Sequence, residues 1–320
     1  MRILVTGAWQ GFRENEEKLK AQGHDLAFLQ WEKDPLPCDY EWPEAIIGNG
    51  IFLSHPIEKF TNLRYIQLTS AGYDRVPMDY VTSHGIEIHN AKGVYSIPMA
   101  EYAVGAALQL YKQFPAFAQS QKQHQWNKIR TLRELNQSKV LVLGCGSVGT
   151  ECAKRFKAFD CQVIGIDLYP REDSNYDAMY PLTTEKDKAS SANQDRAESS
   201  EKDCNTLDTM LSLADIVILT LPLTDQTKGL INKERIQSLK DDAMIINISR
   251  GGVMDYQAFI DLKQTTKQEL MGAFDVFHEE PLDQESLLWN MDGVIVTPHN
   301  SFVGAYNQER LSRVIMMNLQ

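Results

Sequence analysis

Hydrophobic residues occur along the chain in short continuous runs, separated mostly by polar stretches of helix-compatible composition. In residues 1–90 these runs are RILVTG, DLAFLQ, AIIGNG, RYIQLTS and IEIHN. Strands that alternate with helices in this way form a parallel sheet that is covered on both faces. The pattern therefore predicts a doubly wound α/β domain in this part of the chain.

A second series of apolar runs follows, most of them continuous and β-branched: KVLVLG, CQVIGID, DIVILTLPL, AMIINIS, ELMGAFDV and GVIVTPH. Runs of this kind are typical of strands that are buried on both faces. Between the two series, residues 98–114 carry Ala, Val and Leu at helical spacing after a proline, which predicts a long helix that leaves the first domain. Residues 304–319 are again helical in pattern.

The bulk composition fits a globular protein with two domains. The chain has 320 residues, of which 43% are hydrophobic, and a formal net charge of -11 at pH 7. An acidic surface disfavours nucleic acid or an anionic membrane as the main partner, because both attract basic surfaces. Residues 183–204 are nearly free of apolar side chains, which predicts a solvated surface insertion.

Neither targeting nor disulfide signals stand out. The N-terminal MRILVTG runs directly into a strand-like pattern, and no apolar run approaches the length that spans a bilayer, so we expect a cytoplasmic protein. The cysteines are odd in number, scattered and without a C-x-x-C pair, which predicts reduced thiols and no structural zinc site. They are Cys38, Cys145, Cys152, Cys161 and Cys204.

A glycine-rich loop stands between a strong strand and an amphipathic helix in VLVLGCGSVGTECAKRF. Gly144, Gly146 and Gly149 form the pattern G-x-G-x-x-G, and Ser147 and Val148 lie within it. The first glycine permits the tight turn, the second lets the backbone approach a pyrophosphate, and the third lets the helix pack on the strand. The loop therefore predicts a dinucleotide-binding site.

An acid follows at the end of the next strand. Asp167 has the spacing at which a carboxylate accepts hydrogen bonds from the hydroxyls of the adenosine ribose. A carboxylate there repels a 2'-phosphate, so the sequence favours NAD over NADP. Arg171 lies close by and would weaken this preference.

Further polar residues follow the later strands. Arg250 comes after AMIINIS, Asp275 and Glu280 after ELMGAF, and His299 after GVIVTP. Taken singly, these side chains fit a surface salt bridge, a helix cap or a strand cap. In an open parallel sheet, however, the carboxyl ends of the strands meet at the edge where ligands bind. The joint occurrence of these residues therefore predicts a functional site.

With these residues in place, the chain resembles the D-isomer-specific 2-hydroxyacid dehydrogenases, a family of NAD-dependent oxidoreductases. The resemblance rests on ordered motifs along nearly the whole chain: SAGYD, NAKGVYSIPMAEY, GCGSVG with Asp167, LPLTDQTKGLI, NISRGG, DVFHEEPL and TPH. It implies a flavodoxin-like substrate domain of residues 1–98 and 299–320. It also implies an inserted Rossmann-type NAD-binding domain of residues 99–298, and a homodimer that forms through the latter.

The resemblance also implies roles for single residues. Arg250 matches the arginine that holds the carboxylate and carbonyl of the substrate, a forked contact that lysine does not reproduce well. His299 matches the general acid and base, and Glu280 the acid that pairs with it. Glu279 is adjacent, so the choice of Glu280 rests on the spacing in the family.

The remaining matches concern binding. Asp275 corresponds to the residue that holds the nicotinamide carboxamide, and Thr220 and Pro222 to the pocket wall on the adenosine side. The backbone of Ala71 and Gly72 corresponds to the loop that receives the substrate carboxylate. The chain departs from the family pattern after the histidine, where PHNSFVG has Asn300 and the bulky Phe302, so the substrate pocket is expected to differ from that of typical members.

The sequence therefore predicts transfer of a hydride between NAD and C2 of a 2-oxo acid or a D-2-hydroxy acid. Two alternatives stay open at this point. One is a dinucleotide-sensing, corepressor-like binding protein with the same fold. The other is a dehydrogenase dedicated to 3-phosphoglycerate. The sequence does not name the substrate, because specificity depends on the shape of the pocket.

Overall fold

A computed structural model describes residues 1–182 and 206–319. The chain divides into two compact units: unit 1 consists of Met1–Tyr95 and Val303–Gln320, and unit 2 of Ser96–Phe302. The predicted surface insertion, residues 183–204, lies outside the described residues, as does Cys204.

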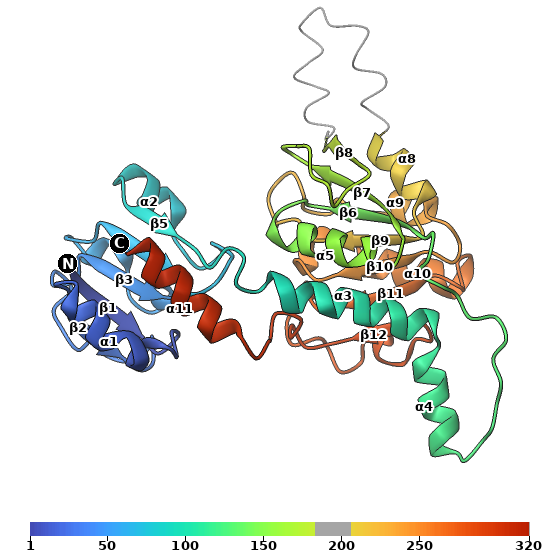
Figure 1. The fold of residues 1–320 in the computed structure, drawn as a ribbon, viewed down its shortest axis with the longest axis horizontal. Helices are drawn as coiled ribbons and strands as arrows, with labels where there is room; N and C mark the ends of the chain where they lie inside the picture. Colours follow the sequence, from blue (N-terminus) through green and yellow to red (C-terminus); the bar gives the residue numbers. More distant parts are fainter. Residues whose placement is uncertain (183–205, 320) are drawn as a thin grey trace, which may run out of the picture. The chain divides into compact units, whose positions relative to one another are not determined.

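Unit 1 is built on a parallel sheet of five strands in the order β2-β1-β3-β4-β5 (Figure 1). The strands are β1 (Arg2–Thr6), β2 (Asp25–Leu29), β3 (Ala45–Gly48), β4 (Tyr65–Leu68) and β5 (Glu87–His89). Every neighbouring pair in this order is parallel, and the order is the one found in flavodoxin-like folds. The prediction of a doubly wound first domain is confirmed.

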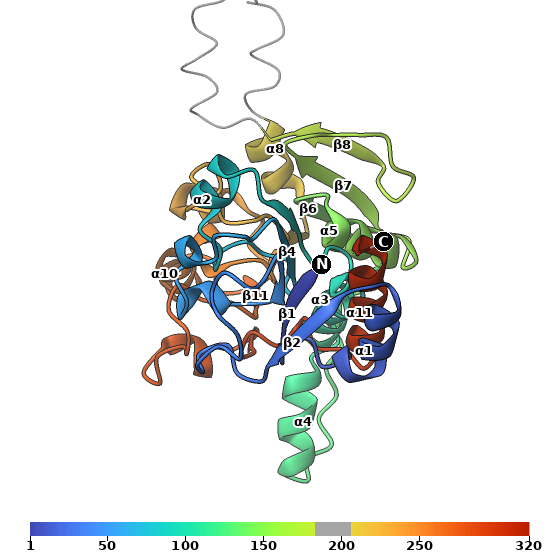
Figure 2. The same cartoon turned by 90° about the vertical axis from the view of Figure 1, so that its left-hand side faces the viewer.

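Helices cover both faces of this sheet. α1 (Phe12–Ala21) and α11 (Asn307–Asn318) lie side by side on one face (Figure 2). Ile3 and Val5 pack toward these two helices, whereas Leu4 points to the opposite face, as the alternation of side chains along a strand requires. The expected C-terminal helix is present as α11, and Trp9 Nε1 donates a hydrogen bond of 2.9 Å to Ser312 Oγ on it. The helical elements of unit 1 are α1 (Phe12–Ala21), η1 (Ile51–Leu53), η2 (Ile57–Lys59), α2 (Met78–Ser83) and α11 (Asn307–Asn318).

Unit 2 contains a parallel sheet of seven strands in the order β12-β11-β10-β9-β6-β7-β8. The strands are β6 (Lys139–Leu143), β7 (Gln162–Asp167), β8 (Ala178–Pro181), β9 (Ile216–Leu219), β10 (Met244–Asn247), β11 (Met271–Phe274) and β12 (Val294–Val296). The sequence pattern predicted all of them except β8. This edge strand is half-buried throughout and ends in a proline, so it lacks the continuous β-branched run of a central strand.

Both faces of the second sheet are also covered. The helical elements of unit 2 are α3 (Ser96–Tyr111), α4 (Phe114–Lys122), α5 (Ser147–Lys157), α8 (Thr206–Leu213), α9 (Lys233–Ser238), η3 (Gly251–Val253), α10 (Tyr256–Thr265) and η4 (Leu287–Asn290). Val140 and Val142 pack against α3 and α5 on one face, and Leu141 and Leu143 against α8, α9 and α10 on the other.

The long helix expected over residues 98–114 is present as α3 (Ser96–Tyr111). α3 ends at Tyr111, and Gln113, with φ of 54°, turns the chain into the separate helix α4. α4 extends away from the rest of unit 2 (Figure 1). None of the helices in the described part of the chain combines the length and the apolar composition needed to cross a membrane.

The order of strands in unit 2 fixes where a ligand can bind. β6, the first strand of the sheet along the chain, has β7 on one side and β9 on the other. The chain thus winds outward in both directions from β6, and the carboxyl ends of β6 and β9 form the topological switch point, where open α/β sheets bind ligands.

Candidate active site

The glycine loop at the carboxyl end of β6 requires glycine at two positions. Gly144 has φ of 95°, and a Cβ there would lie 2.9 Å from the carbonyl group of Thr220. A Cβ on Gly149 would lie 2.0 Å from the carbonyl oxygen of Gly144, so the first turn of α5 packs directly on the loop. The glycines therefore bring the start of α5 to the edge of the sheet.

This loop fits the pyrophosphate of a dinucleotide. Gly146 is the N-cap of α5, and a Cβ built on it would meet no atom within 4 Å, so space is open above the loop. Ser147 and Val148 form the first turn of α5, where backbone N–H groups lie outside the hydrogen-bond ladder of the helix. Such N–H groups and the helix dipole favour an anion at this position.

Thr220 connects the loops on the two sides of the switch point. Its Oγ1 donates to the carbonyl oxygen of Gly144 at 2.6 Å and lies 3.0 Å from that of Leu143. Two residues later, the carbonyl oxygen of Pro222 accepts a hydrogen bond of 2.5 Å from Thr227 Oγ1, which fixes the turn after β9. The predicted residues Thr220 and Pro222 therefore follow β9 beside the glycine loop.

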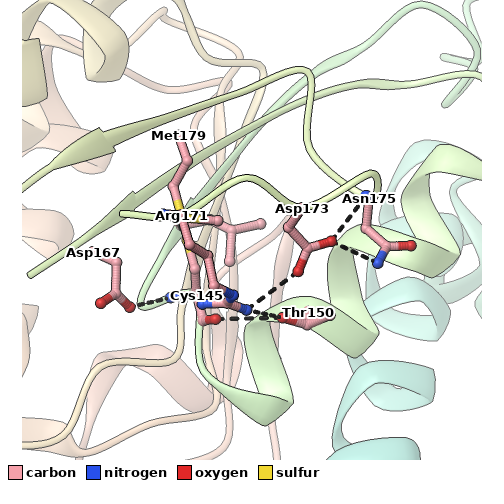
Figure 3. A network of polar contacts seen from close by, with 8 residues as sticks. Cys145, Thr150, Asp167, Arg171, Asp173, Asn175 and Met179 are labelled. Carbon is pink, nitrogen blue, oxygen red and sulfur yellow. Dashed lines mark hydrogen bonds and ion pairs between the residues drawn. The ribbon is translucent and has the colours of Figure 1, made fainter. Parts of the chain in front are cut away.

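Asp167 is also attached to the glycine loop. Its Oδ2 accepts a hydrogen bond of 2.6 Å from the backbone N–H of Cys145, as Figure 3 shows. Its Oδ1 accepts a hydrogen bond of 3.0 Å from the N–H of Tyr169. The carboxylate at the end of β7 is thus fixed in orientation beside the end of β6.

His299 and Glu280 form a hydrogen-bonded pair. Nδ1 of His299 lies 2.8 Å from Oε2 of Glu280, and Oε1 of Glu280 accepts a hydrogen bond of 3.0 Å from the N–H of Phe277. The two side chains are 41% and 38% exposed, so the imidazole is open to a ligand while one of its nitrogens is engaged. A partner at Nδ1 fixes the tautomer and the orientation of the ring.

Asp275 holds the segment that carries His299. Its side chain is completely buried, and its carboxylate accepts hydrogen bonds from Thr297 Oγ1 at 2.5 Å, from the N–H of Asn300 at 2.8 Å and from the N–H of Ser301 at 2.9 Å. Its carbonyl oxygen accepts a further bond of 2.8 Å from the N–H of His299. In the structure the carboxylate of Asp275 therefore accepts its hydrogen bonds from the segment on either side of His299.

Arg250 follows β10, which is the neighbour of β11 in the sheet. The side chain is half-buried, and its Nη1 donates a hydrogen bond of 2.8 Å to the carbonyl oxygen of Ser249. The next residue, Gly251, packs against Phe277 so closely that a Cβ would lie 2.0 Å from the Phe277 carbonyl group. The N–H of Phe277 also donates to the carboxylate of Glu280. The backbone that follows Arg250 therefore packs against the segment that leads to Glu280.

Ala71 and Gly72 belong to unit 1, where they follow β4. Asn90 Nδ2 donates a hydrogen bond of 2.6 Å to the carbonyl oxygen of Ala71. The carbonyl oxygen of Gly72 accepts a hydrogen bond of 3.1 Å from Ser70 Oγ. These bonds fix the carbonyl groups of the loop at the carboxyl edge of the first sheet.

With this geometry established, comparison with known proteins identifies the family. The family model described as "D-isomer specific 2-hydroxyacid dehydrogenase, NAD binding domain" matches residues 104–191 and 186–301, which cover the glycine loop, Arg250, Glu280 and His299. The chain belongs to this family. The family consists of oxidoreductases, so the resemblance in the motifs is confirmed at this level, together with a nicotinamide dinucleotide as the cofactor class.

Individual dehydrogenases of the family match over much of the chain. A D-3-phosphoglycerate dehydrogenase of Archaeoglobus fulgidus is 29% identical over 76% of this chain and 42% of its own length. A glyoxylate reductase of Thermofilum pendens is 29% identical over 81% of this chain and 71% of its own length. The matched region thus spans less than half of the phosphoglycerate dehydrogenase.

A solved structure confirms the fold of the chain. A D-isomer specific 2-hydroxyacid dehydrogenase family protein from Aeromonas salmonicida is 26% identical, with a TM-score of 0.77 over 99% of this chain and 94% of its own. The predicted α/β architecture with two parallel sheets is therefore confirmed.

Two polar residues beside the candidate site were missed by the sequence reasoning. Thr297 donates to Asp275, and the hydroxyl of Tyr102 on α3 lies 2.8 Å from Thr297 Oγ1. Burial raises the pKa of Tyr102 to about 12, so the phenol stays neutral at physiological pH. The one signal in the sequence is a tyrosine among the many apolar residues of α3, because a buried hydroxyl requires a partner.

Proposed function

We propose that the protein is an NAD-dependent D-2-hydroxyacid dehydrogenase, in which His299 acts as the general acid and base. The observation that carries the proposal is the hydrogen bond of 2.8 Å between His299 and Glu280. This pair stands at the carboxyl edge of the sheet that also bears the glycine loop. When bound, NADH supplies the hydride that reduces C2 of a 2-oxo acid.

Glu280 prepares His299 for proton transfer. Its carboxylate accepts the Nδ1–H group and leaves Nε2 as the nitrogen that exchanges a proton with the substrate. During reduction Nε2 donates its proton to the carbonyl oxygen, and during oxidation it accepts the proton of the hydroxyl group. The negative charge of Glu280 stabilises the imidazolium form that reduction requires.

Arg250 binds the acid group of the substrate. A guanidinium presents two parallel N–H donors to a carboxylate, which orients the carbonyl carbon as well as holding the charge. The family description and the contact between the segments of Arg250 and Glu280 support this assignment. The role of Ala71 and Gly72 in receiving the carboxylate stays a prediction.

For the cofactor, the first turn of α5 binds the pyrophosphate and Asp167 binds the ribose hydroxyls. Both carboxylate oxygens of Asp167 already accept one backbone N–H each, and a carboxylate has about four acceptor positions. Thr220 and Pro222 form the wall of the pocket. Asp275 is completely buried, so we assign it the support of the His299 segment, and its contact with the nicotinamide carboxamide stays a prediction.

The test is the loss of NADH absorbance with the purified protein and a panel of 2-oxo acids: glyoxylate, hydroxypyruvate, pyruvate, phosphohydroxypyruvate and larger analogues. Turnover with at least one acid, faster with NADH than with NADPH, is the expected result. A preference for phosphohydroxypyruvate identifies the phosphoglycerate alternative. Binding of NADH without turnover of any acid contradicts the enzymatic proposal and favours the sensing protein.

We also propose that the protein is a homodimer that associates through unit 2. α4 has no buried residue, and apolar side chains are exposed on it and just after it, Phe114 to 55% and Trp126 to 91%. Exposed aromatic residues of this kind are typical of an interface. Light scattering is expected to give twice the mass of the chain, and a monomeric mass would contradict the proposal. The cytoplasmic location stays a prediction from the sequence.

A further inference from the structure

Arg171 is held beside the ribose-binding edge by two polar contacts. It lies four residues after Asp167, in the segment that connects β7 with β8. Its Nη2 donates a hydrogen bond of 3.0 Å to Thr150 Oγ1 on α5 and lies 3.2 Å from Oδ2 of Asp173 (Figure 3). The guanidinium is therefore fixed against the helix that follows the glycine loop.

The carboxylate of Asp173, which pairs with Arg171, is mostly buried and is held in place by further hydrogen bonds. Its side chain is 13% exposed, and its Oδ1 accepts hydrogen bonds from both the backbone N–H and Nδ2 of Asn175, at 3.0 Å and 2.8 Å. Burial by itself raises the pKa of Asp173, but the bonds from Asn175 and the charge of Arg171 outweigh burial and lower it below its ordinary value. The carboxylate is thus ionised at neutral pH.

This pair matters because an arginine at this place can accept the 2'-phosphate of NADP. With Asp173 ionised, the charge of Arg171 is neutralised, and Asp167 adds a further negative charge nearby. A cavity of ≈ 580 Å³ is lined by Arg171 and Asp173 together with the acidic side chains of Glu172 and Asp177. A doubly charged phosphate would meet a net negative surface and a guanidinium whose Nη2 is already engaged by Thr150 and Asp173.

We infer that Asp173 is a specificity-determining residue, which holds Arg171 and thereby excludes the 2'-phosphorylated dinucleotide. The inference rests on the proposed NAD-dependent function and adds a second discriminating acid to Asp167. The two acids act differently: Asp167 repels a 2'-phosphate directly, whereas Asp173 removes the cation that would attract it.

The decisive experiment compares Asp173→Asn with Glu172→Gln. Asp173→Asn removes the charge and keeps a carbonyl oxygen for Asn175, and the ratio of kcat/KM for NADPH to that for NADH is expected to rise about fivefold, the scale of a partly exposed ion pair. Glu172→Gln removes the same charge from the adjacent residue, for which the structure gives no contact with Arg171. It weakens only the general repulsion of the phosphate, so the ratio should rise clearly less than in Asp173→Asn. Equal effects of the two variants would overturn the inference.

A double variant and a binding measurement complete the design. Adding Arg171→Ala to Asp173→Asn should abolish the gain, because the gain depends on the released guanidinium. Calorimetric titration should show that Asp173→Asn binds adenosine 2',5'-bisphosphate more tightly relative to adenosine 5'-monophosphate. Asp173→Ser also removes the carboxylate and serves if Asp173→Asn does not fold.

The outcomes separate this inference from the proposed function. If the unmodified protein binds neither NADH nor NADPH, the proposed function itself is wrong, and the inference falls with it. If it oxidises NADH in the presence of a 2-oxo acid but the ratio is unaltered in Asp173→Asn, only the role of Asp173 is wrong. A preference of the unmodified protein for NADPH would also overturn that role.

Discussion

Thr297 donates its hydroxyl hydrogen to Oδ1 of Asp275 across 2.5 Å, and so joins the residue after β12 to the residue after β11. The same carboxylate also accepts the N–H groups of Asn300 and Ser301. His299 lies between these attachment points with φ of 51°, a left-handed conformation that costs roughly 1–2 kcal/mol for a residue other than glycine. Asp275 and Thr297 therefore stabilise the backbone that presents the histidine.

Thr297→Val tests this arrangement. The substitution keeps the shape of the side chain and removes the hydroxyl, so the buried Asp275 loses one donor and the His299 segment loses one attachment. A hydrogen bond to a charged group contributes about 1.5–3 kcal/mol, so the melting temperature should fall measurably. We expect kcat to decrease with little change in the affinity for NADH. Thr297→Ser keeps the hydroxyl and serves as the control, and equal kcat values in the two variants would argue against a positioning role.

His299→Gln is expected to lose turnover while NADH binding is retained. A positioned general acid typically contributes about 10²- to 10⁴-fold, and glutamine cannot donate a proton in its place. The control is His278→Gln, because His278 Nε2 lies 3.1 Å from the carbonyl oxygen of Met254 and has no assigned role in the reaction. Steady-state kinetics and NADH fluorescence give the two readouts. Normal kcat in His299→Gln would remove His299 from the mechanism.

Glu280→Gln should lower kcat with little change in NADH binding. A neutral amide holds the Nδ1–H group of His299 less firmly than a carboxylate does, so the ring is less well oriented for proton transfer. Glu279→Gln is the matched control, because the structure pairs Glu280 with His299. Equal kcat values for Glu280→Gln and Glu279→Gln would contradict the assignment.

The fold was largely predictable because continuous apolar runs report burial on both faces of a parallel sheet. Strand β8 was not predicted, because its residues, Ala178–Pro181, are half-buried at the edge of the sheet. The helix α4 was also not predicted, because it begins after the left-handed Gln113, a residue type that does not by itself signal the end of one helix and the start of another.

For the candidate site, the sequence motifs indicated residues that follow strands, but they did not indicate the contacts that join distant segments. The motifs yielded His299 and Glu280, whereas the hydrogen bonds of Asp275 to Thr297 and of Asp173 to Arg171 depend on the course of loops. For Asp275 the sequence supplied a binding role, and the structure adds the support of the neighbouring segment. Loop courses follow from packing and not from periodicity, so the sequence pattern alone does not contain them.

The cysteines provide a prediction that does not depend on the substrate. Burial raises the pKa values of the Cys145 and Cys152 thiols to about 12 and that of Cys161 to about 11. The thiolate is the form that attacks an alkylating reagent and displaces its leaving group, and a thiol with a pKa near 12 is ionised in only about one molecule in ten thousand at pH 8. We therefore expect iodoacetamide to label these three residues very slowly in the folded protein and rapidly in denaturant.

Cys38 is the internal reference for this experiment, because it is only partly buried. Its pKa is also raised by burial, yet its sulfur remains more accessible to a reagent than the three buried thiols. Peptide mass spectrometry should therefore find Cys38 modified before Cys145, Cys152 and Cys161. Because Cys145 lies inside the glycine loop, its labelling at the rate of Cys38 would mean that the loop opens in solution, which would contradict the tight packing of Gly144 and Gly149 described above.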